Sequence, residues 1–227
     1  MRTHLLVAVV AALLLSIAGA AVASESYWVV KFRAGRYDPG ETDGAYTNYG
    51  GCTIGASSSP STTTAPNPMS TAANLALRRY AGGGLYNYYG TERLDSDNPP
   101  PYSYEMLMAV GSLYPSSMVY VSAWSPDSYL AQSGRSLPAN YRVTVRKGIT
   151  TLAVWDGEDL YRATDPGTTG LGNVGFYYTP EETNDSWAGV DKDIFTITVD
   201  VPEPAGVLAL ASGLISAAAF ALRRRRT

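Results

Sequence analysis

The 227-residue sequence contains almost no histidine or cysteine, and this scarcity excludes several kinds of chemistry. Its one histidine, His4, lies in an N-terminal segment that we expect to be removed. The mature chain would then have no histidine for a Ser-His-Asp triad, a Cys-His pair or a histidine-ligated zinc site. Its one cysteine, Cys52, cannot form an intramolecular disulfide, so we expect it to be a small buried apolar side chain.

Basic side chains are also scarce between the two ends of the chain. Residues 24–201 contain 12 Lys and Arg against 19 Asp and Glu, which gives this span a formal charge of −7. Binding to nucleic acid depends on a surplus of positive charge, so this composition argues against a nucleic-acid partner. The span is long enough for one domain with its own hydrophobic core.

Long hydrophobic runs occur only at the two ends of the sequence. At the N-terminus, Arg2 precedes an apolar run at 5–18, and Ala21 and Ala23 form an Ala-x-Ala site. This order predicts a secretory signal peptide over 1–23, export by the Sec machinery and cleavage after Ala23.

At the C-terminus, three features follow one another. Residues 205–222 are uncharged and mostly apolar, and as a helix they would extend roughly 27 Å, close to the hydrocarbon thickness of a bilayer. We therefore expect a transmembrane helix at 205–222. Before it lies a stiff strip suited to recognition by another protein, formed by Pro202, Glu203 and Pro204. After it lies a positive cluster that would stay on the cytoplasmic side, formed by Arg223, Arg224, Arg225 and Arg226.

This ending, at 202–227, resembles the PEP-CTERM sorting signal of exported proteins of Gram-negative bacteria. The resemblance implies an exosortase-like processing enzyme that recognises the Pro-Glu-Pro strip. The protein would be anchored transiently in the inner membrane and then passed to the cell envelope, the cell surface or the extracellular matrix, with exopolysaccharide among its partners. The alternative is an ordinary single-pass anchor in which Pro-Glu-Pro is only a linker.

Between these signals, short runs of aromatic and β-branched residues separated by turn formers predict an all-β domain over 24–201. The expected strands include 26–33, 85–89, 104–110, 118–124, 141–146, 149–155, 173–178 and 194–199. Residues 53–71 contain ten Ser or Thr, which predicts a surface loop, with a site of O-glycosylation as the alternative. Residues 72–80 fit a short helix and a strand equally well. The number of short strands favours an antiparallel β-sandwich.

The last third of the domain has the clearest pattern. Apolar and polar residues alternate over 141–146, as in a strand with one buried face, and Asp156-Gly157 is a preferred pair for a tight hairpin. The order of strands and turns over 141–199 resembles the closing strands of laminin-G or concanavalin A-like jelly-rolls. This resemblance implies a jelly-roll-like sandwich, and an immunoglobulin-like sandwich fits the number of strands as well. Residues 191–195 depart from the Phe-Asp-Asn run of that family, so no sugar or metal site is carried over.

Acidic side chains are the remaining groups that could do chemistry. Two carboxylates about 5–10 Å apart could catalyse glycoside hydrolysis. The candidates are Glu105, Asp127, Asp156, Glu158 and Asp159. Acidic clusters at 95–98, 156–159 and 185–193 could supply oxygen ligands to Ca²⁺, but none matches a defined calcium loop. Because no motif fixes a catalytic geometry, we expect neither enzymatic activity nor a cofactor.

Aromatic side chains are abundant, with 17 tyrosines and four tryptophans. Exposed rings can bind the faces of sugars, and Trp187 lies in the polar stretch 183–189, so it is the predicted carbohydrate contact. The sequence therefore favours a non-catalytic exported matrix protein. A carbohydrate-binding module at the cell surface and a two-carboxylate glycosidase are the alternatives.

Overall fold

The computed structural model describes the central domain of the chain. The described residues are 28–36, 47–57, 60–95, 100–114, 118–125, 137–163 and 174–201. The predicted signal peptide, the Pro-Glu-Pro strip, the transmembrane helix at 205–222 and the arginine cluster lie outside them. Within the described ranges, no helix has both the length and the apolar character needed to span a bilayer.

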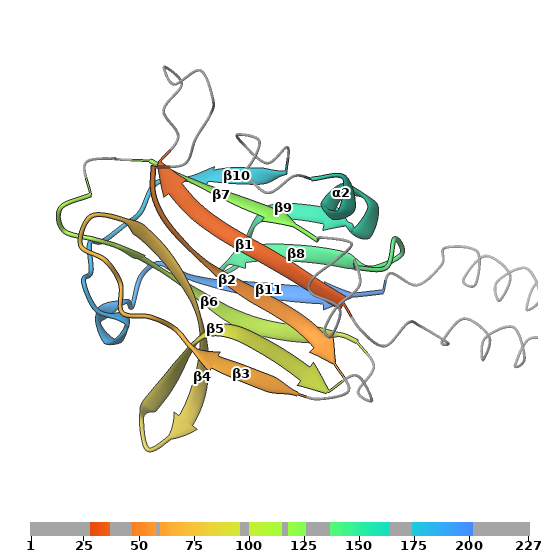
Figure 1. Ribbon diagram of the computed structural model, residues 1–227, viewed down its shortest axis with the longest axis horizontal. Helices are drawn as coiled ribbons and strands as arrows, with labels where there is room; N and C mark the ends of the chain where they lie inside the picture. Colours follow the sequence, from red (N-terminus) through yellow and green to blue (C-terminus); the bar gives the residue numbers. More distant parts are fainter. Residues whose placement is uncertain are drawn as a thin grey trace, which may run out of the picture.

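Strands dominate the domain, which confirms the all-β prediction (Figure 1). In chain order they are β1 (Trp28–Arg36), β2 (Thr47–Ser57), β3 (Ser61–Thr64), β4 (Ala73–Gly82), β5 (Leu85–Asp95), β6 (Tyr102–Val110), β7 (Val119–Trp124), β8 (Arg142–Lys147), β9 (Thr150–Asp156), β10 (Gly175–Tyr178) and β11 (Ile194–Asp200). The helical elements of the described part are α2 (Gly157–Arg162) and the 3-10 turn η1 (Trp187–Gly189).

The eleven strands form one hydrogen-bonded sheet in the order β10-β7-β1-β2-β5-β4-β6-β11-β8-β9, with β3 paired to β5. Pairing is antiparallel except where β2 runs parallel to β4 and β5. The sandwich prediction expected two separate sheets. In the described part of the chain, one sheet instead folds over on itself at the β2–β5–β4 region.

Contacts across the interior show that the two halves of the folded sheet share one core. The ring of Trp28 in β1 lies 5.6 Å from that of Tyr102 in β6, and the hydroxyl of Tyr104 donates to the carbonyl of Gly55 in β2 at 3.0 Å. The two edge strands also meet, because Trp155 of β9 stacks on Phe176 of β10 at 6.3 Å. The inward side chains of the two halves of the sheet therefore bury one another.

Cys52 lies within this core, with 3% of its surface exposed. Burial raises the pKa of its thiol, because the thiolate would lose its hydration. The expectation of a small buried side chain at this position is confirmed.

The loop predicted at 53–71 is wrong for about half of that range. Residues 53–57 complete β2, and β3 (Ser61–Thr64) pairs antiparallel with β5. Threonine is β-branched and fits an exposed strand well, so a Ser/Thr-rich composition does not by itself exclude a strand when a partner is present. Of the two possibilities at 72–80, the structure has the strand, β4.

The hairpin turn predicted at Asp156-Gly157 is also wrong. Asp156 is instead the N-cap of α2, and its side chain accepts a hydrogen bond from the Asp159 amide at 2.8 Å. The Asp159 carboxylate accepts one from the Asp156 amide in return, at 3.2 Å. This reciprocal capping box satisfies two amides that a helix start leaves free, and it decides the local structure against the turn.

The two ends of the described domain lie close together. Trp28 begins β1, and its ring contacts Tyr102, whose backbone pairs with Val199 near the end of β11. Figure 1 shows the start of β1 and the end of β11 at the same side of the sheet.

Candidate functional site

The most prominent surface feature is the hairpin formed by β4 and β5. The first five residues of β4 are buried, and its side chains become exposed after Arg78. The turn consists of Gly82, Gly83 and Gly84, which have φ angles of 100°, 61° and 80°. Residues with a Cβ rarely adopt this left-handed region, so the three glycines allow the chain to reverse at the tip. Figure 1 shows this hairpin projecting from the body of the domain.

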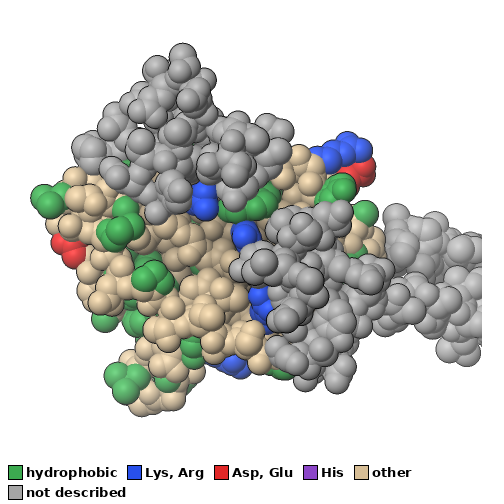
Figure 2. Space-filling view, viewed as in Figure 1, with side chains coloured by type: hydrophobic (Ala, Val, Ile, Leu, Met, Phe, Trp, Pro, Cys, Tyr) green, Lys and Arg blue, Asp and Glu red, His purple; other side chains and the backbone are tan. Residues whose placement is uncertain are grey.

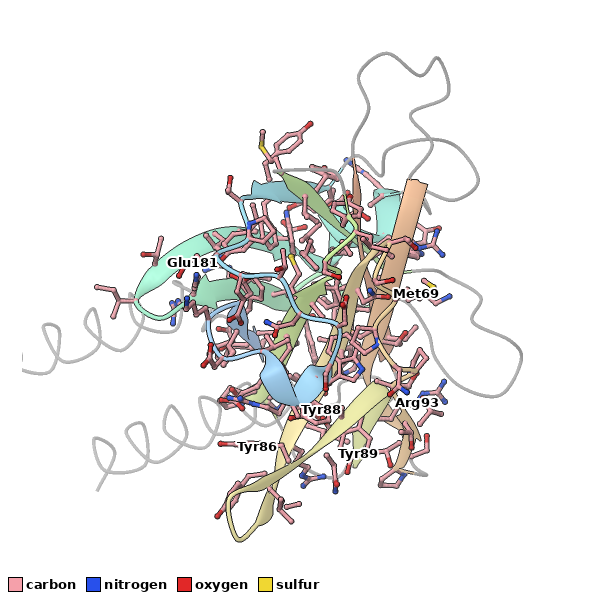
Figure 3. All side chains as sticks on the ribbon, turned by 90° about the vertical axis from the view of Figure 1, so that its left-hand side faces the viewer. Met69, Tyr86, Tyr88, Tyr89, Arg93 and Glu181 are labelled. Carbon is pink, nitrogen blue, oxygen red and sulfur yellow. The ribbon has the colours of Figure 1, made fainter. Side chains whose placement is uncertain are left out.

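One face of the hairpin holds a line of aromatic rings, which we call the tyrosine row: Trp187, Tyr88, Tyr86 and Tyr80. Tyr80 of β4 pairs across the hairpin with Tyr86 of β5, and their ring centroids are 5.5 Å apart. Nearer the core, Tyr88 stacks on Trp187 at 6.5 Å and 26°. Between the two pairs, the Arg78 guanidinium lies 4.3 Å from the centroid of the Tyr86 ring. In Figure 3, Tyr88 lies beside η1, and Tyr86 lies further towards the tip.

Exposure rises along the tyrosine row. Trp187 is 5% exposed, whereas Tyr86 is 38% and Tyr80 is 61% exposed. Leu85, at the start of β5, is 71% exposed, and Figure 2 shows hydrophobic side chains at the tip of the hairpin. The outer half of the row is therefore available to a partner.

The charges at the hairpin are paired. Arg78 forms an ion pair with Glu105 of β6 at 2.9 Å, and Arg79 forms one with Glu92 at 3.3 Å. Glu92 is buried, and this burial raises the pKa of its carboxyl group while the Arg79 charge lowers it. The hairpin therefore has no formal net charge from these four groups.

Trp187 does not lie where the sequence predicted. Its ring is covered, and its Nε1 donates to the carbonyl of Pro66 at 2.8 Å. It belongs to a small second core on the outer side of β4 and β6, with Ala65, Ala76, Leu107, Ala109 and Val190. The expectation of an exposed ring is wrong, and a ring covered in this way cannot stack on a sugar.

The polar residues around Trp187 hold this second core in place. The Asp185 carboxylate accepts hydrogen bonds from the Ser112 amide at 2.9 Å and the Ser112 hydroxyl at 2.6 Å. These bonds lower the pKa of Asp185. The Asn184 amide donates to the carbonyl of Val110 at 2.8 Å. The polar composition of 183–189 thus reflects attachment of the segment to β6.

A buried carboxylate anchors the same region, which we call the anchor segment and define as residues 179–193. Asp193 has no exposed surface and accepts hydrogen bonds from the Tyr178 hydroxyl at 2.6 Å and the Glu181 amide at 3.0 Å. Lys147, from the β8–β9 hairpin, lies 3.7 Å from the same carboxylate and also contacts Tyr178 and Glu181. Burial and the bond to Asp193 raise the pKa of Tyr178 to about 12.

Glu182 closes the anchor segment on itself. Its Oε1 accepts hydrogen bonds from the Asp191 amide at 2.8 Å and the Lys192 amide at 2.9 Å. Burial alone would raise the pKa of Glu182, but these amides stabilise the carboxylate and the net shift is downward. Beside the segment lies an open groove of about 440 Å³, lined by Val110, Tyr114 and residues 179–183.

Four of the five candidate catalytic carboxylates have structural partners. Asp156 and Asp159 form the capping box of α2, and Glu158 pairs with Arg162 one turn later. Glu105 pairs with Arg78, and Asp127 lies outside the described residues. The structure brings Asp156, Glu158 and Asp159 together, but their arrangement is that of a helix start.

The described ranges contain no cluster of metal ligands. There, no group of three or more His, Cys, Asp or Glu side chains is close enough to hold an ion. The acidic cluster at 95–98 falls largely outside these ranges.

Sequence reasoning missed Tyr80 and Tyr86. Each lies two residues from the glycine triplet, and an alternating pattern on each side places Arg78 and Tyr80 opposite Tyr88 and Tyr86. A hairpin centred on the triplet would have revealed this face, but the helical alternative at 72–80 obscured it. Comparisons with protein families, curated proteins and solved structures gave no match.

Proposed function

We propose that the chain is an exported, non-catalytic protein that an exosortase-like enzyme delivers to the envelope or extracellular matrix of a Gram-negative bacterium. Support for sorting comes from the sequence of 202–227 and from its likeness to PEP-CTERM signals. The structure adds that β1 begins and β11 ends at one side of the domain, whereas the β4–β5 hairpin projects from another (Figure 1). A tether at residue 201 is therefore compatible with contact through the hairpin.

The sorting proposal is tested with variants of the Pro-Glu-Pro strip. Replacing Glu203 with Ala, or Pro202 and Pro204 together, should leave unprocessed protein in the inner membrane, because the processing enzyme would lose its recognition strip. The intact mass of protein recovered from membrane, envelope and medium measures this outcome. Glu158→Ala, which removes an exposed carboxylate on α2, serves as the control and should be processed normally. Normal release of the Glu203 variant would contradict the proposal.

We also propose that the exposed half of the tyrosine row contacts exopolysaccharide. The observation that carries this proposal is the exposure of Tyr80 and Tyr86, 61% and 38%, on a projecting hairpin. A tyrosine ring offers an apolar face to the C–H groups of a sugar, and its hydroxyl adds a hydrogen-bonding group. Exposed apolar side chains grouped on one surface are typical of interaction sites.

Retention of the protein on exopolysaccharide tests this contact. Tyr80→Ala and Tyr86→Ala should each reduce retention, because each removes one exposed ring. Tyr161→Ala is the matched control, since Tyr161 is a tyrosine on α2 with a similar exposure of 52%. Equal retention of all three variants and the unchanged protein would place any glycan contact elsewhere.

The finer topology belongs to the same proposal. We propose a jelly-roll-like sandwich whose two layers remain joined at the β2–β5–β4 region. Support comes from the layers that face each other across one core and from the antiparallel pairing of β11 with both β6 and β8.

A further inference from the structure

The two exposed rings of the tyrosine row are held in a defined relation. The Gly84 amide donates to the hydroxyl of Tyr80 at 3.3 Å, and the Arg78 guanidinium lies over the ring of Tyr86. Arg78 is itself fixed by Glu105. Each ring therefore has its own support, and together they form a preorganised pair, which lowers the entropy lost when a ligand binds.

The rings of this pair are inclined to each other. Their centroids are 5.5 Å apart, and their planes meet at 66°. The successive sugars of a flat, extended chain present nearly parallel faces, so such a chain can stack on only one of the two rings. A chain that turns between successive sugars presents inclined faces and can contact both.

Charge supplies a second criterion. The cations nearest the pair, Arg78 and Arg79, are both engaged by carboxylates. The exported span has a formal charge of −7, so its overall field repels polyanions. The pair thus offers an anionic glycan no surplus of positive charge.

We infer that Tyr80 and Tyr86 form a binding site for an uncharged glycan chain that coils or bends, such as a β-1,3-linked glucan. This inference rests on the proposed glycan contact and specifies its ligand. The inclined rings provide the selection for shape, and the paired charges provide the selection against acidic sugars.

The test uses the full-length chain in a polyoxyethylene detergent, because detergents with sugar headgroups would compete for the site. Affinity electrophoresis compares three soluble probes: a coiled β-1,3-linked glucan, the extended hydroxyethyl cellulose, and a carboxymethylated form of the same β-1,3-glucan. The unchanged protein should bind the coiled neutral glucan at least about tenfold more tightly than either of the others. The carboxymethylated probe keeps the linkage and adds negative charge through its substituents.

Single-ring variants test whether the preference for coiled glucan needs both tyrosine rings. In Tyr80→Ala or Tyr86→Ala, the remaining ring cannot distinguish inclined from parallel sugar faces, so the preference for coiled over extended glucan should fall to within about twofold. Tyr161→Ala should keep the full preference. Circular dichroism and the thermal midpoint establish that each variant is folded, and having two independent variants allows a decision if one of them is not.

The outcomes distinguish this inference from the function on which it rests. If the protein binds none of the probes and no exopolysaccharide from producing cells, the proposed glycan contact fails. If it binds the extended or the acidic probe as tightly as the coiled neutral one, glycan binding stands and the inference is overturned. A preference that persists in both hairpin variants would also overturn it, because the selecting site would then lie elsewhere.

Discussion

The two ends of the tyrosine row contain the same kinds of side chain in opposite environments. At the base, the ring of Trp187 is 5% exposed and stacks on Tyr88. At the tip, Tyr80 is 61% exposed and meets Tyr86 across the hairpin. The base is covered by the anchor segment and by residues around Pro66, whereas the tip extends beyond the sheet.

This contrast shows that residue type does not decide whether an aromatic ring stabilises the domain or is available for binding. Burying a large ring removes apolar surface from water and strengthens the fold. An exposed ring contributes little to stability and keeps its surface for a ligand. The variants below test the two ends separately, in order of decreasing expected effect on the free energy of unfolding.

The largest effect is expected at the base. Trp187→Ala removes a buried ring, its hydrogen bond to Pro66 and its stacking on Tyr88. This change should lower the free energy of unfolding by about 4 kcal/mol. Denaturant unfolding followed by far-ultraviolet circular dichroism measures this change, with Tyr80→Ala as the comparison. A loss below about 1 kcal/mol would mean that the second core does not depend on this ring.

A somewhat smaller effect is expected at the anchor of the same segment. Asp193→Asn replaces a buried carboxylate that accepts hydrogen bonds from Tyr178, Glu181 and Glu182. The NH2 group of the new side chain cannot accept a hydrogen bond, yet it would face some of these donors. The free energy of unfolding should fall by about 3 kcal/mol. Glu158→Gln, which breaks an exposed pair within α2, is the control and should change it by less than about 0.5 kcal/mol. Equal effects of the two variants would show that burial of Asp193 has no energetic weight.

Acid should loosen the anchor segment through Glu182. The pKa of Glu182 is lower in the folded state than its ordinary value of about 4.3, so the charged form contributes stability above that value. This contribution is lost as the pH falls through the folded-state pKa. Below about pH 4, the protection factors of the Asp191 and Lys192 amides, which donate to Glu182, should therefore fall.

Glu182→Gln supplies the control for the effect of acid, because glutamine does not titrate. In this variant, the protection factors of the two amides should change much less below about pH 5, and the free energy of unfolding at neutral pH should fall by about 1 kcal/mol. An unchanged acid response would assign the effect to another group.

The smallest effect on stability is expected at the tip. The double variant Tyr80→Ala and Tyr86→Ala should change the free energy of unfolding by less than about 1 kcal/mol, because both rings are substantially exposed. Thermal unfolding of this variant beside Trp187→Ala gives the direct measure of the contrast. A large loss at the tip would show that the hairpin rings serve the fold and would weaken the case for a binding surface.

Much of the sheet could be predicted because strand formation has a strong local component. Alternating apolar and polar residues indicated β8 and β11, and runs of aromatic and β-branched residues indicated β1, β6 and β7. The predictions failed where a distant partner decides. Residues 61–64 form a strand because β5 pairs with them. The error at Asp156-Gly157 has a local cause, because Asp156 forms a capping box with Asp159, three residues later, and this starts a helix in place of the turn.

The sequence predicted the type of side chain at the candidate site but not which residues form it. Abundant tyrosine and tryptophan indicated aromatic contacts, but the polar neighbours of Trp187 suggested exposure where the fold provides a cover. Those neighbours bind Val110, the last residue of β6, and Ser112 just after it, both of which are more than 70 residues away in the sequence. No local pattern reports such a contact.

The sequence by itself determined that the central domain is built of strands, that Cys52 is buried and that aromatic side chains are available, because propensity and alternation act between near neighbours. Only the tertiary structure decided which aromatic rings are free. Packing of the anchor segment against β4 and β6 covers Trp187, and the length of the β4–β5 hairpin beyond the sheet leaves Tyr80 and Tyr86 in solvent. Exposure is a property of what surrounds a side chain in space, and those surroundings come from segments that are far apart along the chain.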